Sequence, residues 1–98
     1  MYLVRNIFYA KPGSGKALIK MFKEAAPYIE ENGVAKNTRI LVDAVASFWT
    51  VIIEEEVEDL NGYLDMAKSI RNGEKLGEII KNYTDLITGG KREVFRIE

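Results

Sequence analysis

Two neighbouring stretches of the chain carry apolar residues on both of their alternating sides, and this feature constrains the fold more than any other. Residues 38–45 and 48–57 are rich in Val, Ile, Phe, Trp and Thr, which favour β-strands, and only Ala46 and Ser47 separate them. We predict an antiparallel hairpin with a short turn. A sheet with one face in water alternates apolar and polar residues, and these strands do not. Helices can cover one face, so we expect a second copy of the chain to cover the other.

A strand and a helix are predicted before this hairpin. A β-favouring run at residues 2–10 ends at Lys11-Pro12-Gly13. Apolar residues at helical spacing then follow Ser14, the expected N-cap, and stop at Asn32-Gly33. Pro27 lies inside this helix and lacks a backbone donor, so we expect a kink or an early end near residue 26.

A second helical region, in two pieces, follows the hairpin. We expect Asp59 to cap its first piece, Asn72-Gly73 to break it, and Gly89-Gly90 to end it before a last strand at residues 91–97. The order is therefore βαββαβ. It predicts an α+β fold with an antiparallel sheet, formed by one domain that spans residues 1–98.

The composition excludes several classes of partner. The 98 residues include 14 basic and 15 acidic side chains, for a formal charge of −1, so no basic field is present to bind nucleic acid or an anionic membrane. No apolar run approaches the roughly 20 residues that are needed to cross a bilayer. We expect a cytoplasmic protein with neither nucleic acid nor membrane among its partners.

Two residue types that carry much of enzyme chemistry are missing. The chain has no cysteine, which excludes disulfides, thiolate nucleophiles and zinc–thiolate sites. It also has no histidine, which excludes the commonest general base and the usual haem ligand. Only oxygen ligands remain for a metal, and we expect neither a metal nor another cofactor.

The glycine-rich turn before the first helix suggests a phosphate-binding loop at first sight. Gly13-Ser14-Gly15-Lys16 would offer backbone amides and a lysine at a helix N-terminus. Ala10 and Ala17, however, stand where the full pattern needs a glycine and a hydroxyl residue. We interpret the segment as an ordinary strand-to-helix turn.

An acidic run at residues 54–59 contains enough carboxylates for a hard cation. Alternation along a strand points Glu54, Glu56 and Glu58 one way and Glu55 the other, which divides the set. We favour a solvated strand end that discourages aggregation at the sheet edge.

Polar residues within apolar surroundings mark a candidate ligand site. Trp49 is the only tryptophan, and other aromatic residues are expected to gather around it, either as core and dimer interface or as a pocket for a flat, mostly apolar ligand. Arg5 and Asn6 interrupt an apolar strand. At least one should face the interior, where an unpaired polar group costs about 1–3 kcal/mol. The candidate ligand-binding residues are Arg5, Asn6, Asp43, Trp49 and Tyr63.

Three stretches of the chain resemble a known superfamily. They are Lys-Pro-Gly-Ser-Gly-Lys at 11–16, Phe-Trp-Thr-Val-Ile-Ile-Glu-Glu-Glu-Val-Glu-Asp at 48–59, and Gly-Gly-Lys-Arg-Glu-Val-Phe-Arg-Ile at 89–97. Together they resemble the dimeric α/β-barrel superfamily, especially its NIPSNAP-like members. The resemblance implies a ferredoxin-like protomer whose sheet packs on that of a partner, with a pocket between sheet and helices or inside the barrel.

Two functions stay open at this point, because a fold does not select a chemistry. One is a binding or assembly module that dimerises, or assembles further, and holds a small apolar ligand. The other is an enzyme similar to the superfamily's cofactor-independent monooxygenases, acting on a quinol or a polyketide-type aromatic. In that enzyme Arg5, Asn6 and Trp49 line the cavity and stabilise a substrate anion. Haem degradation fits less well, because those enzymes normally ligate iron through histidine.

Overall fold

The fold consists of four strands and three helices in the predicted βαββαβ order. The computed structural model describes residues 1–31, 33–45, 48–69 and 75–98. A short 3₁₀ helix, η2, precedes the last strand. The elements are β1 (Tyr2–Ala10), α1 (Gly15–Glu31), β2 (Ala35–Val42), β3 (Thr50–Val57), α2 (Leu60–Ser69), α3 (Lys75–Ile79), η2 (Tyr83–Leu86) and β4 (Ile87–Arg96).

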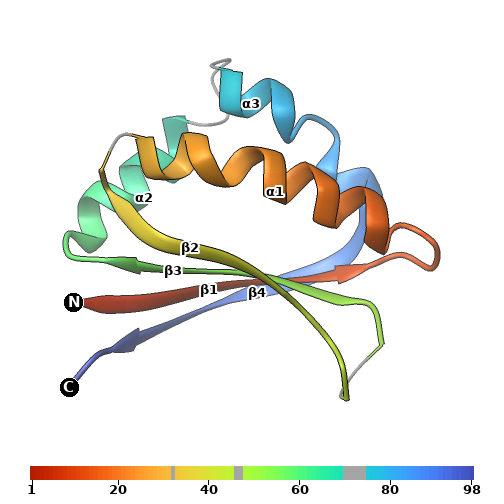
Figure 1. The fold of residues 1–98 in the computed structure, drawn as a ribbon, viewed down its shortest axis with the longest axis horizontal. Coiled ribbons are helices and arrows are strands. Elements are labelled where there is room, and N and C mark those ends of the chain that lie inside the picture. The colour runs from red at the N-terminus through yellow and green to blue at the C-terminus, as the bar shows by residue number, and fades with distance from the viewer. Residues whose placement is uncertain (32, 46–47, 70–74) are drawn as a thin grey trace.

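The strands form one antiparallel sheet in the order β2-β3-β1-β4. In the part of the chain that the structure describes, all helices lie on the same side of the sheet, and no described element covers the opposite face (Figure 1). Helix α1 packs mainly against β2 and β3. Helices α2 and α3 and the 3₁₀ helix η2 lie on the same side of the sheet as α1 (Figure 1). This is the ferredoxin-like α+β arrangement. Among the residues described, no helix is both long enough and apolar enough to span a bilayer.

The core lies between the sheet and α1 and divides into two clusters. Val4 and Val57 from the sheet meet Ala25 of α1 in the first. Leu18 and Phe22 of α1 meet Val51 of β3 in the second. The apolar stripe predicted for the first helix is therefore its buried face. Along each strand, the residues that belong to these clusters are an even number of positions apart, because alternate side chains point to the same face of a sheet.

Helix α1 runs through Pro27 to Glu31, so the early end expected near residue 26 is wrong. Ala25 and Ile29 flank Pro27 in sequence, and both are buried against the sheet. Tertiary packing on both sides of Pro27 holds the helical conformation there, and it outweighs the lost backbone hydrogen bond. The helix stops next to Gly33, which has the positive φ of 77° expected for a helix terminus.

The hairpin strands are shorter at their connection than predicted. Strand β2 ends at Val42 and β3 begins at Thr50, whereas the predicted limits were residues 45 and 48. Asp43 closes the ladder, because its Oδ1 and its backbone N–H both bond to the backbone of Thr50. Trp49 has a φ of 61°, outside the extended region, which prevents β3 from starting earlier. The predicted Ala46-Ser47 turn lies outside the described residues, as does the Asn72-Gly73 break.

The last strand begins at Ile87, four residues earlier than predicted, and Gly89 and Gly90 lie inside it. These glycines were expected to end a helix. The structure instead gives Gly90 a packing role: a Cβ atom there would lie 2.4 Å from the carbonyl oxygen of Ile7. Only a residue without a side chain allows β4 to approach β1 this closely.

Candidate functional site

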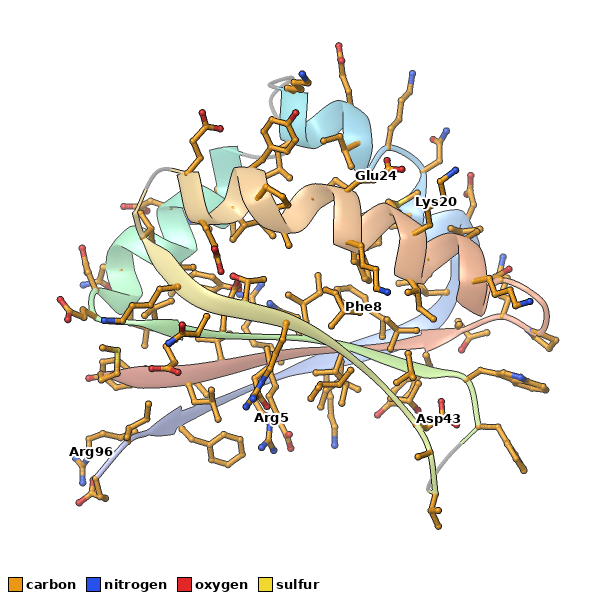
Figure 2. The ribbon with its side chains drawn as sticks, in the orientation of Figure 1. Arg5, Phe8, Lys20, Glu24, Asp43 and Arg96 are labelled. Carbon is orange, nitrogen blue, oxygen red and sulfur yellow. The ribbon has the colours of Figure 1, made fainter. Side chains whose placement is uncertain are left out.

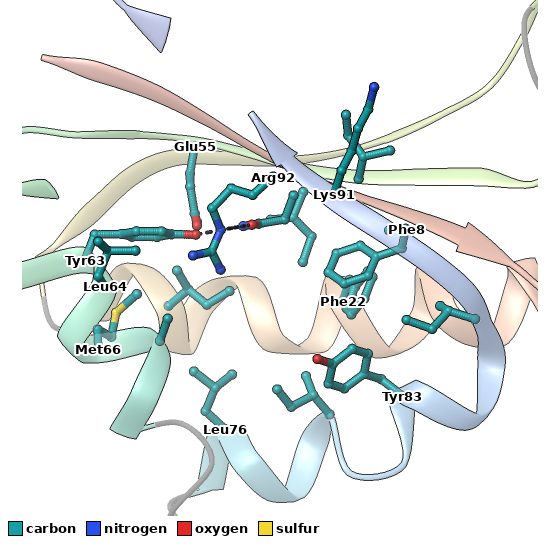
Figure 3. Close-up of a pocket in the computed structure, with 18 of the residues that line it drawn as sticks. Phe8, Phe22, Glu55, Tyr63, Leu64, Met66, Leu76, Tyr83, Lys91 and Arg92 are labelled. Atoms are coloured by element: carbon teal, nitrogen blue, oxygen red, sulfur yellow. Dashed lines mark hydrogen bonds between the residues drawn. The ribbon is translucent and has the colours of Figure 1, made fainter. Parts of the chain in front are cut away.

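A cavity of about 580 Å³ lies between the helices and the β1–β4 half of the sheet (Figure 3). Its walls are mostly apolar, and its volume falls within the roughly 300–1,000 Å³ of small-molecule sites. Helix α1 contributes Phe22 and Ile29 to its wall. The apolar lining of the cavity includes Phe8, Phe22, Ile53, Leu76, Ile80 and Tyr83.

A chain of hydrogen bonds crosses one end of this cavity and includes two of the predicted site residues. Asn6 of β1 donates from Nδ2 to the Tyr63 hydroxyl of α2 at 2.7 Å. The Asn6 Oδ1 in turn accepts a hydrogen bond from Nε of Arg92 on β4, at 2.6 Å. Figure 3 shows the Tyr63 and Arg92 side chains extending toward each other between sheet and helix. Asn6 is thus the polar residue of the first strand that faces the interior, as the sequence predicted.

Glu55 completes this chain from β3. Its side chain interacts with the hydroxyls of Tyr63 and Thr38, with Thr38 Oγ1 at 3.3 Å, and the residue is 2% exposed. Burial raises the pKa of this carboxyl, and the hydrogen bonds from the two hydroxyls oppose that rise. A register shift in β2 between Lys36 and Arg39 allows Thr38 to reach Glu55.

The hydrogen bonds all run in one direction, from the Arg92 guanidinium toward the Glu55 carboxyl. Arg92 fixes the orientation of the Asn6 amide, which then donates to Tyr63, so the Tyr63 proton is available for Glu55. Burial, together with the neighbouring Glu55, raises the pKa of Tyr63, which keeps the phenol protonated. Within the described residues, no buried side-chain polar atom is left without a partner.

Arg5 lies on the opposite face of the sheet from this cavity (Figure 2). It donates from Nε to Glu54 at 2.8 Å, and Arg39 donates to the other carboxylate oxygen of Glu54. The Glu54 side chain is only 3% exposed. The hydrogen bond from Arg5 lowers the pKa of Glu54, with a smaller contribution from Arg39, while burial opposes the shift. The predicted solvated strand end is therefore wrong for Glu54 and for Glu55, although their opposite directions were predicted.

Asp43 and Trp49, the other two predicted site residues, lie at the connection between β2 and β3. Asp43 accepts a hydrogen bond from the backbone N–H of Thr50 at 2.8 Å. The Trp49 side chain is half exposed, and its ring centroid lies 6.0 Å from that of Phe48. Neither residue lines the cavity. The aromatic cluster in the cavity surrounds Phe8 and not Trp49. The ring centroid of Phe8 lies 4.8 Å from that of Phe22 and 5.8 Å from that of Tyr83.

The sequence-based candidates omitted the charged residues that line the cavity, which are Glu55, Lys68, Lys91 and Arg92. Glu55 has the same strand parity as the apolar Ile53 and Val57, and this signal could have placed it on the helix side. Arg92 offered a weaker signal, because its immediate neighbours, Lys91 and Glu93, are also charged.

The face without helices is partly apolar, as the two-sided strands predicted. Pairing in the sheet sets Ile7 beside Ile52, and Ile52 beside Leu41, on the side of Arg5. Phe95 lies on the same face and is 44% exposed, with the Arg5 guanidinium 5.2 Å from its ring centroid. The sheet therefore has apolar surface on the side that no helix covers.

Solved structures share this ferredoxin-like fold over nearly the whole chain, while no family model matches it. A NIPSNAP family protein from Agrobacterium tumefaciens superposes with a TM-score of 0.79 at 13% identity, covering 99% of this chain and 85% of that one. An antibiotic biosynthesis monooxygenase superposes with a TM-score of 0.77 at 14% identity, covering 100% and 99%.

A NIPSNAP domain protein from Burkholderia xenovorans gives a TM-score of 0.77 at 8% identity, covering 100% of this chain and 95% of that one. At these low identities, the TM-scores establish a shared fold. The resemblance to NIPSNAP-like proteins that the sequence predicted is confirmed as a resemblance of fold.

Proposed function

We propose that the chain is a single-domain, homodimeric binding protein for a small, mostly apolar ligand, which it holds between sheet and helices. The observation that carries the proposal is the 580 Å³ cavity, whose apolar walls meet one organised polar cluster. Sites for small organic molecules have this composition: apolar walls supply affinity, and a few fixed polar groups supply orientation.

The walls favour a ligand that contains a ring. Phe8, Phe22 and Tyr83 form a contiguous aromatic surface, with centroid separations of 4.8 to 6.5 Å. Aromatic pairs at such distances prefer tilted or offset arrangements, which another ring can extend. The polar cluster of Asn6 and Tyr63 lies at the α2 end of the same cavity.

Binding of the neutral fluorophore N-phenyl-1-naphthylamine tests this proposal. We expect saturable fluorescence enhancement with the wild-type chain. Ala67 lines the cavity, so Ala67→Phe should narrow it and weaken the enhancement. Ala17→Phe introduces the same side chain at an exposed position of α1 outside the cavity and should leave binding unchanged. Equal binding by both variants would contradict the assignment of the pocket.

The proposed dimer rests on the uncovered face of the sheet. A layer with apolar surface on both sides needs a second cover, and in the described residues all helices lie on one side. Leu41, Ile52 and Phe95 contribute the apolar surface, and the paired charges of Arg5 and Glu54 lie among them. A second copy presents the same surface, as a two-fold symmetric interface requires.

Sedimentation velocity tests the dimer with two neighbouring substitutions on β4. Phe95 and Val94 are 44% and 42% exposed, and they lie on opposite faces of the sheet. We expect Phe95→Lys to dissociate the dimer and Val94→Lys to leave it intact. Dissociation by both, or by neither, would contradict the proposed interface.

The alternative function is a cofactor-independent monooxygenase-like enzyme acting on a quinol or a polyketide-type aromatic. The observation that favours it is the position of the hydrogen-bonded Asn6 beside the aromatic wall, where it can orient a flat substrate. The antibiotic biosynthesis monooxygenase of the same fold is consistent with this chemistry.

Oxygen uptake with a hydroquinone substrate separates the enzyme from the binding protein. The enzyme predicts uptake above the uncatalysed rate that Asn6→Ala removes and Trp49→Phe retains, because Trp49 lies outside the cavity. Wild-type uptake at the background rate would exclude the enzyme for that substrate class and leave the binding protein.

A further inference from the structure

We propose that the cavity selects ligands that carry a carboxylate on an apolar body, and that the Arg92 guanidinium binds this carboxylate. This inference rests on the proposed ligand-binding function and specifies its ligand class. Arg92 lines the cavity and presents N–H donors to it (Figure 3).

Arg92 uses only part of its hydrogen-bonding capacity within the protein. Its Nε donates to Asn6, and the structure gives its two Nη groups no hydrogen bond or ion pair with the described residues. The guanidinium lies 5.6 Å from the centre of the Tyr63 ring, which limits its orientation. A guanidinium held by Nε leaves parallel N–H groups for the two oxygens of a carboxylate.

The charges around Arg92 favour an anion. Lys68, on the last turn of α2, lines the same cavity and is exposed. Glu55 is the acidic residue among the described residues of the lining, and its carboxyl already interacts with the hydroxyls of Thr38 and Tyr63. Arg92 and Lys68 of the lining outnumber this carboxyl, so the balance of charge around the cavity is positive.

The apolar wall fixes where the rest of the ligand lies. Phe8 and Phe22 line the part of the cavity away from Arg92, near Tyr83. A ligand with its carboxylate at Arg92 therefore extends its apolar body toward these rings. A neutral ligand can occupy the same wall but gains nothing from the guanidinium.

Two ligands of equal shape test the inference: 2-naphthoate and its neutral analogue 2-naphthamide. We expect the wild-type dissociation constant for the carboxylate to be about 2- to 5-fold lower than for the amide, the range of an exposed ion pair, because Arg92 is exposed. Arg92→Met should remove this preference while leaving amide affinity within about twofold. Arg92→Lys keeps the positive charge but lacks the two parallel N–H donors of a guanidinium, so it should retain a smaller preference for the carboxylate.

Lys91 provides the matched control. It precedes Arg92 on β4 and is counted among the lining residues, but its side chain extends away from the cavity (Figure 3) and pairs with Glu93 at 3.7 Å. Lys91→Met removes the same charge and should leave the preference unchanged.

The possible results distinguish failure of the carboxylate assignment from failure of the proposed ligand-binding function. Equal binding of both ligands by the wild type would overturn the carboxylate assignment and keep the pocket. A preference that survives in Arg92→Met would also overturn it. Binding of neither ligand would overturn the pocket and the inference together.

Discussion

Glu55 and Glu54 are sequence neighbours on β3 that face opposite sides of the sheet, and they should respond to pH with opposite signs. The pKa of Glu55 is raised by burial, so the folded state holds its proton more tightly than the unfolded chain does. Its contribution to stability is present at low pH and is lost as pH rises from the ordinary value of 4.5 through the raised value. Glu55→Gln removes this ionisation and keeps an amide in place of the carboxyl.

The magnitude follows from proton linkage. One group that titrates differently in the two states changes the unfolding free energy by at most about 1.4 kcal/mol per pH unit. We therefore expect Glu55→Gln to gain stability relative to the wild type as pH rises above 4.5, at up to this slope, until Glu55 is ionised in the folded wild type. Above the raised pKa of Glu55, the gain stays constant.

Glu54→Gln is the matched comparison. The pKa of Glu54 is lowered mainly by its hydrogen bond with Arg5, so its contribution is present above 4.5 and is lost as pH falls through the lowered value. This variant should be less stable than the wild type at neutral pH by about 1–3 kcal/mol, and the difference should shrink in acid.

Urea unfolding from pH 3.5 to 8, at one fixed protein concentration, measures both profiles. A Glu55→Gln profile parallel to the wild type would refute the assignment of the pH dependence to this buried carboxyl. A stability difference for Glu54→Gln that grows in acid would refute the role given to its arginine partners.

Further predictions concern the sheet and the polar cluster. Gly90→Ala places a Cβ 2.4 Å from the Ile7 carbonyl oxygen, roughly 1 Å short of ordinary contact, and should cost about 2–4 kcal/mol in chemical denaturation. Gly89→Ala meets nothing closer than 4.0 Å and should change stability by less than about 1 kcal/mol, so equal costs would contradict the close approach of β4. Tyr63→Phe removes the acceptor of the 2.7 Å bond from Asn6 and should lower the melting temperature, at a cost of about 1–3 kcal/mol; an unchanged melting temperature would contradict that bond's contribution.

The order of elements could be predicted because it depends on local patterns. Apolar spacing identified the helix whose buried residues include Leu18 and Phe22, and apolar residues at both strand parities predicted surface on both faces of the sheet. The ends of helices and strands were predicted less accurately where contacts between distant parts of the chain determine them. Pro27 remains helical because its neighbours pack on the sheet, and Gly90 belongs to a strand because β4 lies close to β1.

The candidate site was predicted in part for a similar reason. Asn6 was identified as a polar residue in an apolar strand, and Tyr63 as an aromatic residue with a polar group; both line the cavity. Glu55 and Arg92 take part because α2 lies over this half of the sheet and brings Tyr63 between β1 and β3, which no local pattern specifies. Trp49 was predicted as a site residue because it is large and is the only tryptophan. Its position outside the cavity depends on the backbone conformation between β2 and β3, where its φ is positive.

Native mass spectrometry of the wild-type chain, sprayed with and without excess 2-naphthoate, tests the central claim most directly because it reports subunit number and bound ligand together. We predict the mass of two chains, increased by one naphthoate per chain when the ligand is present. A single-chain mass at micromolar concentration would contradict the dimer, and a two-chain mass without any added ligand would contradict the binding site.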